Sequence, residues 1–252
     1  MTHTIIGLVS FVAIFGGALI GLFAAHRLPG HHLSKETQSA ITVSVAVLGT
    51  LSALVLGLMI TAANSSFSAR SEEVRELSLQ LIRMDRNLRR YGPEAQDART
   101  KLHDWAVAKT HQLFPVKGES NPSSEQTIVM LEAVQDALLG LKPQGERQTY
   151  LRTLCLKLSS TMIEARWSLE TRSAHSIPVP FLVLLIFWLS IVFASFGLFA
   201  PTNAVTIAAL LLCSVAVAGG IYMIEDLDMP KEGFVQLPSD SMKRALVEIG
   251  AK

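Results

Sequence analysis

The sequence lacks most of the features that identify an enzyme or a disulfide-bonded domain. Its 252 residues contain two cysteines, and neither belongs to a CxxC pair, so a disulfide framework is excluded. No Gly-rich phosphate loop, GxSxG or HExxH motif occurs, and the chain is therefore not expected to be an enzyme. A formal net charge of only +1 lacks the basic excess that is typical of nucleic-acid-binding proteins, so nucleic acid is not an expected partner.

Charge is scarce along much of the chain. Charged residues make up 17% of the sequence and hydrophobic residues 50%, with a mean hydropathy of +0.38. Four runs of about 20 residues or slightly more contain no Asp, Glu, Lys or Arg, which is enough for a helix to cross the hydrocarbon of a bilayer. These predicted spans are Ile5–Ala25, Ala40–Ala63, Ile177–Ala200 and Ala204–Met223. Without ionisable side chains in the spans, a proton-driven pump or an Arg-rich voltage sensor is not expected.

Small residues are plentiful in the first and last spans. Gly17 and Gly21 form a GxxxG pair on the first, and Ala216 with Gly220 forms a similar pair on the fourth. Such pairs let helix backbones approach closely, so we interpret both as packing positions.

Most of the charge lies between the second and third spans. Residues 64–176 hold 16 of the 22 Lys and Arg and 14 of the 21 Asp and Glu. Apolar residues recur there at steps of three and four, most clearly in the seam from Val74 to Leu88, which is typical of one face of a helix. The sequence therefore predicts an all-α polytopic membrane protein with four transmembrane helices and a helical cytoplasmic region between the second and third. Its parts are residues 1–63 (two spans), 64–176 (the helical region), 177–224 (two spans) and 225–252 (a C-terminal tail).

Turn residues divide the helical region into four helices. Tyr91-Gly92-Pro93 ends the first, because proline cannot extend a helix and biases the preceding residue away from helical geometry. Further helices are expected from Glu94 to Leu113, from Ile128 to Leu141, and from Leu151 onward.

Basic residues near the span ends predict the orientation. The side that carries the helical region and the tail has more of them than the opposite side, where only Arg27 and Lys35 occur. Those on the first side are Arg70, Arg75, Arg166, Arg172, Lys231, Lys243 and Arg244. Since basic flanks stay in the cytoplasm, we expect the helical region and both termini to be cytoplasmic.

A weakly polar stripe follows the second span at helical spacing and becomes more polar toward the cytoplasm. Its members are Thr50, Leu54, Gly57, Leu58, Thr61, Asn64 and Ser68. Such a stripe can line a water-filled path in which the leucines form a constriction that gates by dewetting, and Arg70 at the pore mouth could attract anions. It can equally be a helix–helix contact rich in Ser and Thr, and spacing alone favours neither interpretation.

Three carboxylates follow the fourth span, at Glu225, Asp226 and Asp228. Carboxylate oxygens suit Ca²⁺, so this cluster is a candidate calcium site, and the sequence indicates no other cofactor. The alternative interpretation, a solvated acidic edge at the membrane surface, describes the commoner situation.

Four stretches carry a resemblance to a known family. They are LVLGL at 54–58 continuing to Ser66-Phe67, RYGPEA at 90–95, SFGLFAPTNAV at 195–205 and LDMPKEGFVQL at 227–237. On these residues the chain resembles the bacterial bestrophin-like membrane proteins, which are more loosely similar to the bestrophins. Bestrophins are pentameric anion channels whose second membrane helix lines the pore and whose acidic cluster after the last membrane helix binds Ca²⁺.

The resemblance implies a pentameric channel with a pore formed by the second span. The leading hypothesis is an oligomeric ion channel of the bacterial inner membrane that conducts anions, with membrane lipid, inorganic anions and further copies of the chain as partners. The alternative is a membrane-anchored interaction or sensory protein that oligomerises through the seam from Val74 to Leu88 without conducting ions.

Overall fold

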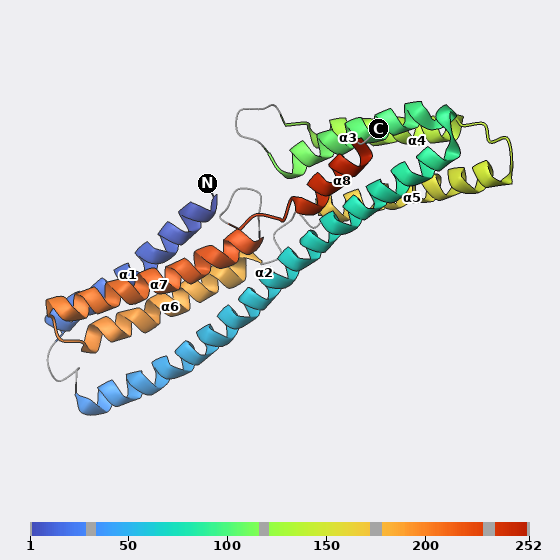
Figure 1. Cartoon of the computed structure of the whole chain (residues 1–252). Helices are drawn as coiled ribbons and strands as arrows, with labels where there is room; N and C mark the ends of the chain where they lie inside the picture. Colours follow the sequence, from blue (N-terminus) through green and yellow to red (C-terminus); the bar gives the residue numbers. More distant parts are fainter. Residues whose placement is uncertain (1, 29–33, 116–120, 172–177, 229–234, 251–252) are drawn as a thin grey trace. The chain divides into compact units, whose positions relative to one another are not determined.

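The computed structural model describes residues 2–28, 34–115, 121–171, 178–228 and 235–250. All regular secondary structure in these ranges is helical, as the all-α prediction requires (Figure 1). The chain divides into two compact units, residues 1–67 with 175–235 and residues 68–174 with 236–252. Helix α2 (Lys35–Tyr91) contributes its first part to one unit and its second part to the other.

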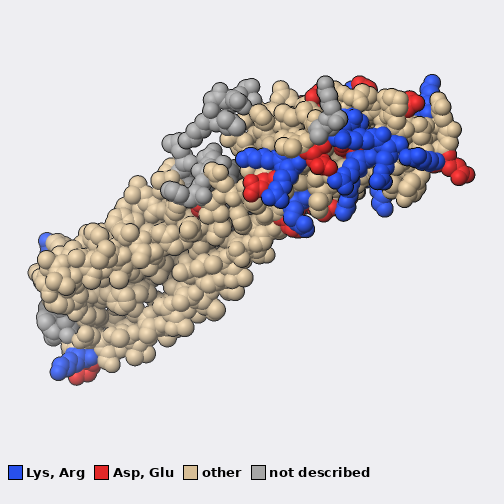
Figure 2. All heavy atoms as spheres, in the orientation of Figure 1, with Lys and Arg blue, Asp and Glu red and all other residues tan. Residues whose placement is uncertain are grey.

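The first unit contains the four predicted spans. Its helices are α1 (Thr2–Arg27), the first part of α2, α6 (Val179–Phe199) and α7 (Ala204–Asp228). Within the described ranges, α1, α2, α6 and α7 are the four helices that are long and apolar enough to cross a membrane. Figure 2 shows the visible face of these helices without charged side chains between their ends. The prediction of four spans is confirmed, although α2 begins before Ala40 and α7 continues beyond Met223.

Glycine lets α1 and α6 approach closely. A Cβ added at Gly17 would lie 2.6 Å from the Ser190 carbonyl oxygen, and one at Gly21 would overlap the Ala194 carbonyl oxygen. The interpretation of this GxxxG pair as a packing position is confirmed. Gly220 on α7 differs, because a Cβ there would meet nothing within 4 Å, so the second small-residue pair makes no such close contact within the described chain.

The second unit is a helical bundle built from the rest of α2 and five further elements. They are the 3₁₀ turn η2 (Pro93–Ala95), α3 (Gln96–Leu113), α4 (Ser124–Gly140), α5 (Glu146–Thr171) and α8 (Asp240–Gly250). α2 ends where Gly92 adopts a φ of 130°, a conformation that glycine alone adopts readily. α3 starts slightly later than predicted because η2 occupies Pro93 to Ala95. A capping box formed by Ser123 and Gln126 starts α4.

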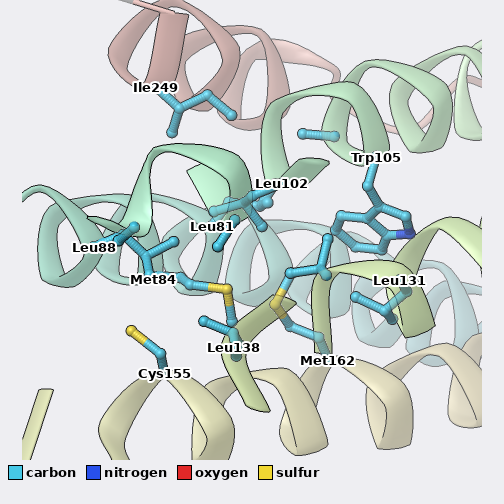
Figure 3. Packing of buried hydrophobic residues seen from close by; sticks show 14 of the residues in the cluster. Leu81, Met84, Leu88, Leu102, Trp105, Leu131, Leu138, Cys155, Met162 and Ile249 are labelled. Atoms are coloured by element: carbon cyan, nitrogen blue, oxygen red, sulfur yellow. The ribbon is translucent and has the colours of Figure 1, made fainter. Parts of the chain in front are cut away.

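The core of the second unit contains the seam from Val74 to Leu88. Every apolar member of the seam is at most 2% exposed, and from Leu77 onward the seam joins α3, α4, α5 and α8 in one apolar cluster (Figure 3). Trp105 is buried in this cluster and donates an Nε1–H hydrogen bond to the Thr127 carbonyl oxygen at 2.9 Å. The seam is therefore occupied within the chain. The expectation that it mediates association between chains is wrong, because a second chain would have to displace this core.

Helix α8 lies in the stretch that was predicted to be a tail. Met242 and Ile249 enter the core of the second unit. Arg86 of α2 pairs with the Glu248 carboxylate at 2.9 Å, and Arg89 donates to the Glu248 carbonyl oxygen at 2.9 Å. An apolar face and two arginine contacts to its last turn thus attach α8 to α2.

Candidate functional site

The predicted stripe on α2 is exposed along its whole length. Leu54 and Leu58 are 61% and 63% exposed. The remaining members are exposed as well: Thr50, Gly57, Thr61, Asn64 and Ser68. An α-helix turns by about 100° per residue, so a residue two positions away lies roughly 200° around the axis. Most of the stripe therefore lies nearly opposite Ser52, Met59 and Ala63, which are at most 6% exposed.

Met59 and Ala63 belong to the apolar cluster that α2 forms with α1, α6 and α7. One side of α2 thus packs against its own bundle. The side that carries the stripe is not buried by any other part of the described chain. The stripe includes two large apolar side chains, Leu54 and Leu58, and both remain more than half exposed. This side is available for lipid, for other copies of the chain, or for a water-filled path.

The hydroxyl groups of the stripe are hydrogen-bonded to their own helix. Thr50 Oγ1 donates to the Ala46 carbonyl oxygen at 2.9 Å, and Thr61 Oγ1 donates to the Gly57 carbonyl oxygen at 2.9 Å. Threonine makes this bond to the residue four positions earlier in many helices. It satisfies the donor without water, while the lone pairs of each oxygen can still accept from a passing water molecule.

Arg70 does not lie at an exposed pore mouth. The residue is 8% exposed and has an interaction partner within the structure. It follows Ser68 by two positions, so it lies roughly 200° around the helix from the stripe. The expected placement of Arg70 is corrected accordingly, and its charge is not presented on the face that carries the stripe.

The three carboxylates at the end of α7 are buried. Glu225 is 3% exposed, and Asp226 and Asp228 are fully buried. Asp226 Oδ2 accepts a hydrogen bond from the Val235 N–H at 2.9 Å, whereas its Oδ1 has no hydrogen-bond partner among the described residues. Glu225 and Asp228 each have an interaction partner. The alternative of a solvated acidic edge does not describe these side chains.

A calcium site at this position stays a prediction. Within the described ranges, no group of three or more His, Cys, Asp or Glu side chains is placed to hold a metal ion. Ca²⁺ takes six to eight oxygen ligands, which include backbone carbonyls and water, so Glu225, Asp226 and Asp228 would supply only part of its coordination.

Sequence reasoning missed a basic groove in the second unit. It lies between the second part of α2 and α5, and four of its lining residues are Lys or Arg. Arg83, Arg86 and Arg90 recur at steps of three and four, which places them on one face of α2. This spacing was visible in the sequence, but the partner residues on α5 are more than sixty positions away.

Cys155 is not a reactive centre of the second unit. Cys155 is buried in the core, where burial raises the pKa of its thiol to about 12. A thiol with such a pKa stays protonated and inert at neutral pH. Cys213 lies on α7 and is exposed.

The family model for the bestrophin-like domain matches residues 12–242, which is nearly the whole chain. The chain belongs to the bestrophin-like family. Among curated proteins, none matches it significantly.

Solved structures with the same fold come from bacterial bestrophin homologues. Two crystal structures of point-substituted variants of a bestrophin homologue from Klebsiella pneumoniae superpose on the bestrophin-like chain with TM-scores of 0.67 and 0.68. The sequence identities are 16% and 17%, and the matches cover 98% and 96% of this chain and 99% and 98% of the homologue. At this identity the likeness establishes the fold of the bestrophin-like chain along almost its full length.

Proposed function

We propose that this bestrophin-like chain forms an oligomeric ion channel of the bacterial inner membrane, and that the stripe on α2 lines its pore. The observation that carries the proposal is the exposure of the whole stripe on the side of α2 that faces away from its own bundle. A helix that lines a pore must keep one side for its own subunit and the other for the conduction path, and α2 has two such sides.

Self-association is a necessary part of the proposal. Within one chain, α1, α6 and α7 contribute to one apolar cluster with Met59 and Ala63 of α2, and the stripe on the other side of α2 is not enclosed by the described chain. A pore therefore has to form where stripes from several copies face each other. Membership of the bestrophin-like family supports this arrangement, because the bestrophins to which the sequence is similar are pentameric channels.

Leu54 and Leu58 would form the narrowest part of such a pore. Rings of leucine create an apolar constriction that gates by dewetting: it conducts ions while it is hydrated and closes when water withdraws from it. Thr61, Asn64 and Ser68 follow toward the second unit and would supply a more hydrated entrance. Because this stretch of sequence has no ionisable residues, the passage of ions through the constriction would depend on its diameter and polarity.

Conduction of anions is the finer part of the proposal. It is supported by the similarity to bestrophins and by the basic residues that flank the spans on the side of the second unit. Their excess also supports the placement of the second unit and both termini in the cytoplasm. Arg70 is left out of this part because it is buried.

Ion flux from liposomes that contain the purified protein tests the proposal. Chloride and potassium are compared, for the wild type and for Thr61→Trp, which would place an indole in the pore. Val183→Trp on α6 is the matched control, since Val183 is also in a span and is 59% exposed. We expect chloride flux from the wild type and the control and none from Thr61→Trp. Absence of flux for both ions from oligomeric wild-type protein would refute the channel, and equal flux from both tryptophan variants would refute the assignment of the pore.

A further inference from the structure

A groove with an unusual concentration of cations lies in the second unit, between one face of α2 and one face of α5. It has a volume of about 530 Å³, which is within the range of small-molecule sites, roughly 300–1,000 Å³. Figure 2 shows the Lys and Arg side chains gathered over this part of α2. The lining residues are Glu76, Gln80, Arg83, Arg86, Asn87, Arg90, Leu154, Lys157, Leu158 and Thr161.

Three of the four cations in the groove form no ion pair within the described chain, and Glu76 is the one carboxylate among the lining residues. Arg86 pairs with Glu248, but Arg83, Arg90 and Lys157 have no carboxylate within ion-pair distance in the part of the chain that the structure describes. Three such cations that line one groove from two helices favour a ligand with several anionic oxygens. Guanidinium groups bind phosphate through two parallel hydrogen bonds, a geometry that a chloride ion cannot use.

Gln80 provides an independent indication of a ligand. It lines the groove and is only 4% exposed, yet its Oε1 has no hydrogen-bond partner among the described residues. A buried acceptor without a partner is costly, so native proteins usually satisfy it with a protein group, a water molecule or a ligand. The Oε1 atom lies beneath the surface of the groove, so a ligand reaches it when the flexible Gln80 side chain turns toward the groove, and such a ligand must offer a hydroxyl or amine donor.

We propose that this groove is a binding site for a phosphorylated compound that also carries a hydroxyl group. Its phosphate oxygens contact Arg83, Arg90 and Lys157, and its hydroxyl donates to Gln80 Oε1. The apolar side chains of Leu154 and Leu158 form the part of the groove that contacts the carbon skeleton. This site is separate from the stripe on α2 and does not depend on whether the chain conducts ions.

Binding of two probes to the full-length protein in detergent tests the site. The probes are inorganic diphosphate and glycerol 3-phosphate, measured by isothermal titration calorimetry at constant ionic strength. We expect saturable binding of both at micromolar to about millimolar concentrations. Because each variant removes a charge-assisted hydrogen bond, Arg90→Gln and Lys157→Gln should each weaken binding about tenfold or more. Gln80→Leu should weaken the binding of glycerol 3-phosphate more than that of diphosphate.

Arg75→Gln is the matched control. Arg75 is also an exposed arginine on α2, but it pairs with Glu72 and lies outside the groove. Equal loss of affinity in Arg75→Gln and Lys157→Gln would show that only the overall charge matters, and it would overturn the proposal. Absence of saturable binding to protein with wild-type thermal stability would overturn it as well.

Two further arms identify what occupies the groove in the cell. Competition by nanodiscs that contain phosphatidylglycerol, but not by phosphatidylcholine nanodiscs, would support the site and assign the phosphate to a lipid headgroup. If instead Lys157→Gln dissociates the oligomer on size-exclusion chromatography and wild-type binding is absent, a second copy of the chain covers the groove, and the proposal of a small-molecule site is overturned.

Discussion

Replacing Gly21 with alanine should destabilise the protein, although the same replacement stabilises most helices. The added Cβ would overlap the Ala194 carbonyl oxygen of α6 and lie 3.0 Å from the Leu198 nitrogen. Both atoms belong to the backbone, so no side chain can rotate out of the way. The two helices would have to separate locally and lose packing along their contact.

The magnitude follows from two opposing contributions. Overpacking a well-packed contact costs about 1–3 kcal/mol, whereas replacing a helical glycine with alanine gains roughly 0.5–1 kcal/mol. The net loss at Gly21 is therefore up to about 2.5 kcal/mol. For a protein of this size, each kcal/mol shifts Tm by about 2–4 °C, so we expect Gly21→Ala to lower Tm by up to about 10 °C.

Gly220→Ala is the control, since a Cβ at this position of α7 meets nothing within 4 Å. It should retain only the gain in helix stability and leave Tm unchanged or slightly raised. Both variants are compared with the wild type by scanning fluorimetry in the same detergent and at the same scan rate, because membrane proteins often unfold irreversibly. A Tm for Gly21→Ala at or above that of Gly220→Ala would refute the close approach of α1 and α6.

Three further measurements address the second unit. Asp85→Asn should lower the stability of the second unit by about 2–3 kcal/mol, because the buried Asp85 carboxylate pairs with Arg89 at 2.7 Å and Arg99 at 2.9 Å. Both arginines are partly exposed, which reduces the loss below that of a fully buried pair. Denaturant unfolding followed by circular dichroism would detect the loss, and an unchanged midpoint would contradict it. Mass spectrometry after maleimide treatment at pH 8 should find Cys155 unlabelled in the folded protein, because burial raises its thiol pKa to about 12, and labelled after unfolding. Labelling of Cys155 in the folded protein would contradict the packing. The hydrogen bond from Arg86 lowers the pKa of Glu248 from 4.5. The contribution of this ion pair to stability is therefore complete above the pKa that Glu248 has in the unfolded chain. It is lost as pH falls through the pKa that Glu248 has in the folded chain. Hydrogen exchange in α8, corrected for the intrinsic rate, should therefore accelerate below about pH 4.5, and acceleration that Glu248→Gln leaves unchanged would contradict this origin.

The membrane-spanning helices were predictable because their signal is a long absence of charge. A run without Asp, Glu, Lys or Arg over about 20 residues is rare outside helices that cross a bilayer. The ends were less predictable, since helical geometry continues beyond the apolar run wherever packing supports it. α2 illustrates this clearly: its backbone stays helical from Lys35 through the charged sequence to Tyr91.

Helix α8 was missed although its sequence contained the information. Met242, Ala245 and Ile249 recur at helical spacing after Asp240, which lies in the first turn. Eleven residues with three apolar positions on one face are too few to form a stable helix alone. The stability of α8 comes from Met242 and Ile249 in the core and from the arginines of α2, which are far away in the sequence. Such partners cannot be deduced from a local pattern.

Arg70 was misplaced for a different reason. The prediction considered its position along the axis of α2, just beyond Ser68, and not its angle around the axis. Two residues correspond to roughly 200° on a helix, so the spacing itself places Arg70 away from the stripe. The periodicity also separates Thr61 from Met59 and Ala63, and the structure buries the latter two. Angular position was thus predictable from the sequence, whereas the partners that bury each side were not.

The exposed leucines on α2 indicate that this side of the helix has a contact outside its own chain. Leu54 and Leu58 are more than half exposed in a helix whose other side is packed, so in the membrane they contact lipid, a second copy, or the wall of a pore. Polar groups in hydrocarbon are costly unless they are satisfied, but Thr50 and Thr61 are satisfied by their own helix and are compatible with all three environments. Asn64 and Ser68 follow the predicted span, in the part of α2 that is expected to lie outside the hydrocarbon, so they are compatible with all three as well. The flux of Thr61→Trp, compared with that of Val183→Trp, therefore decides whether this side of α2 lines a pore.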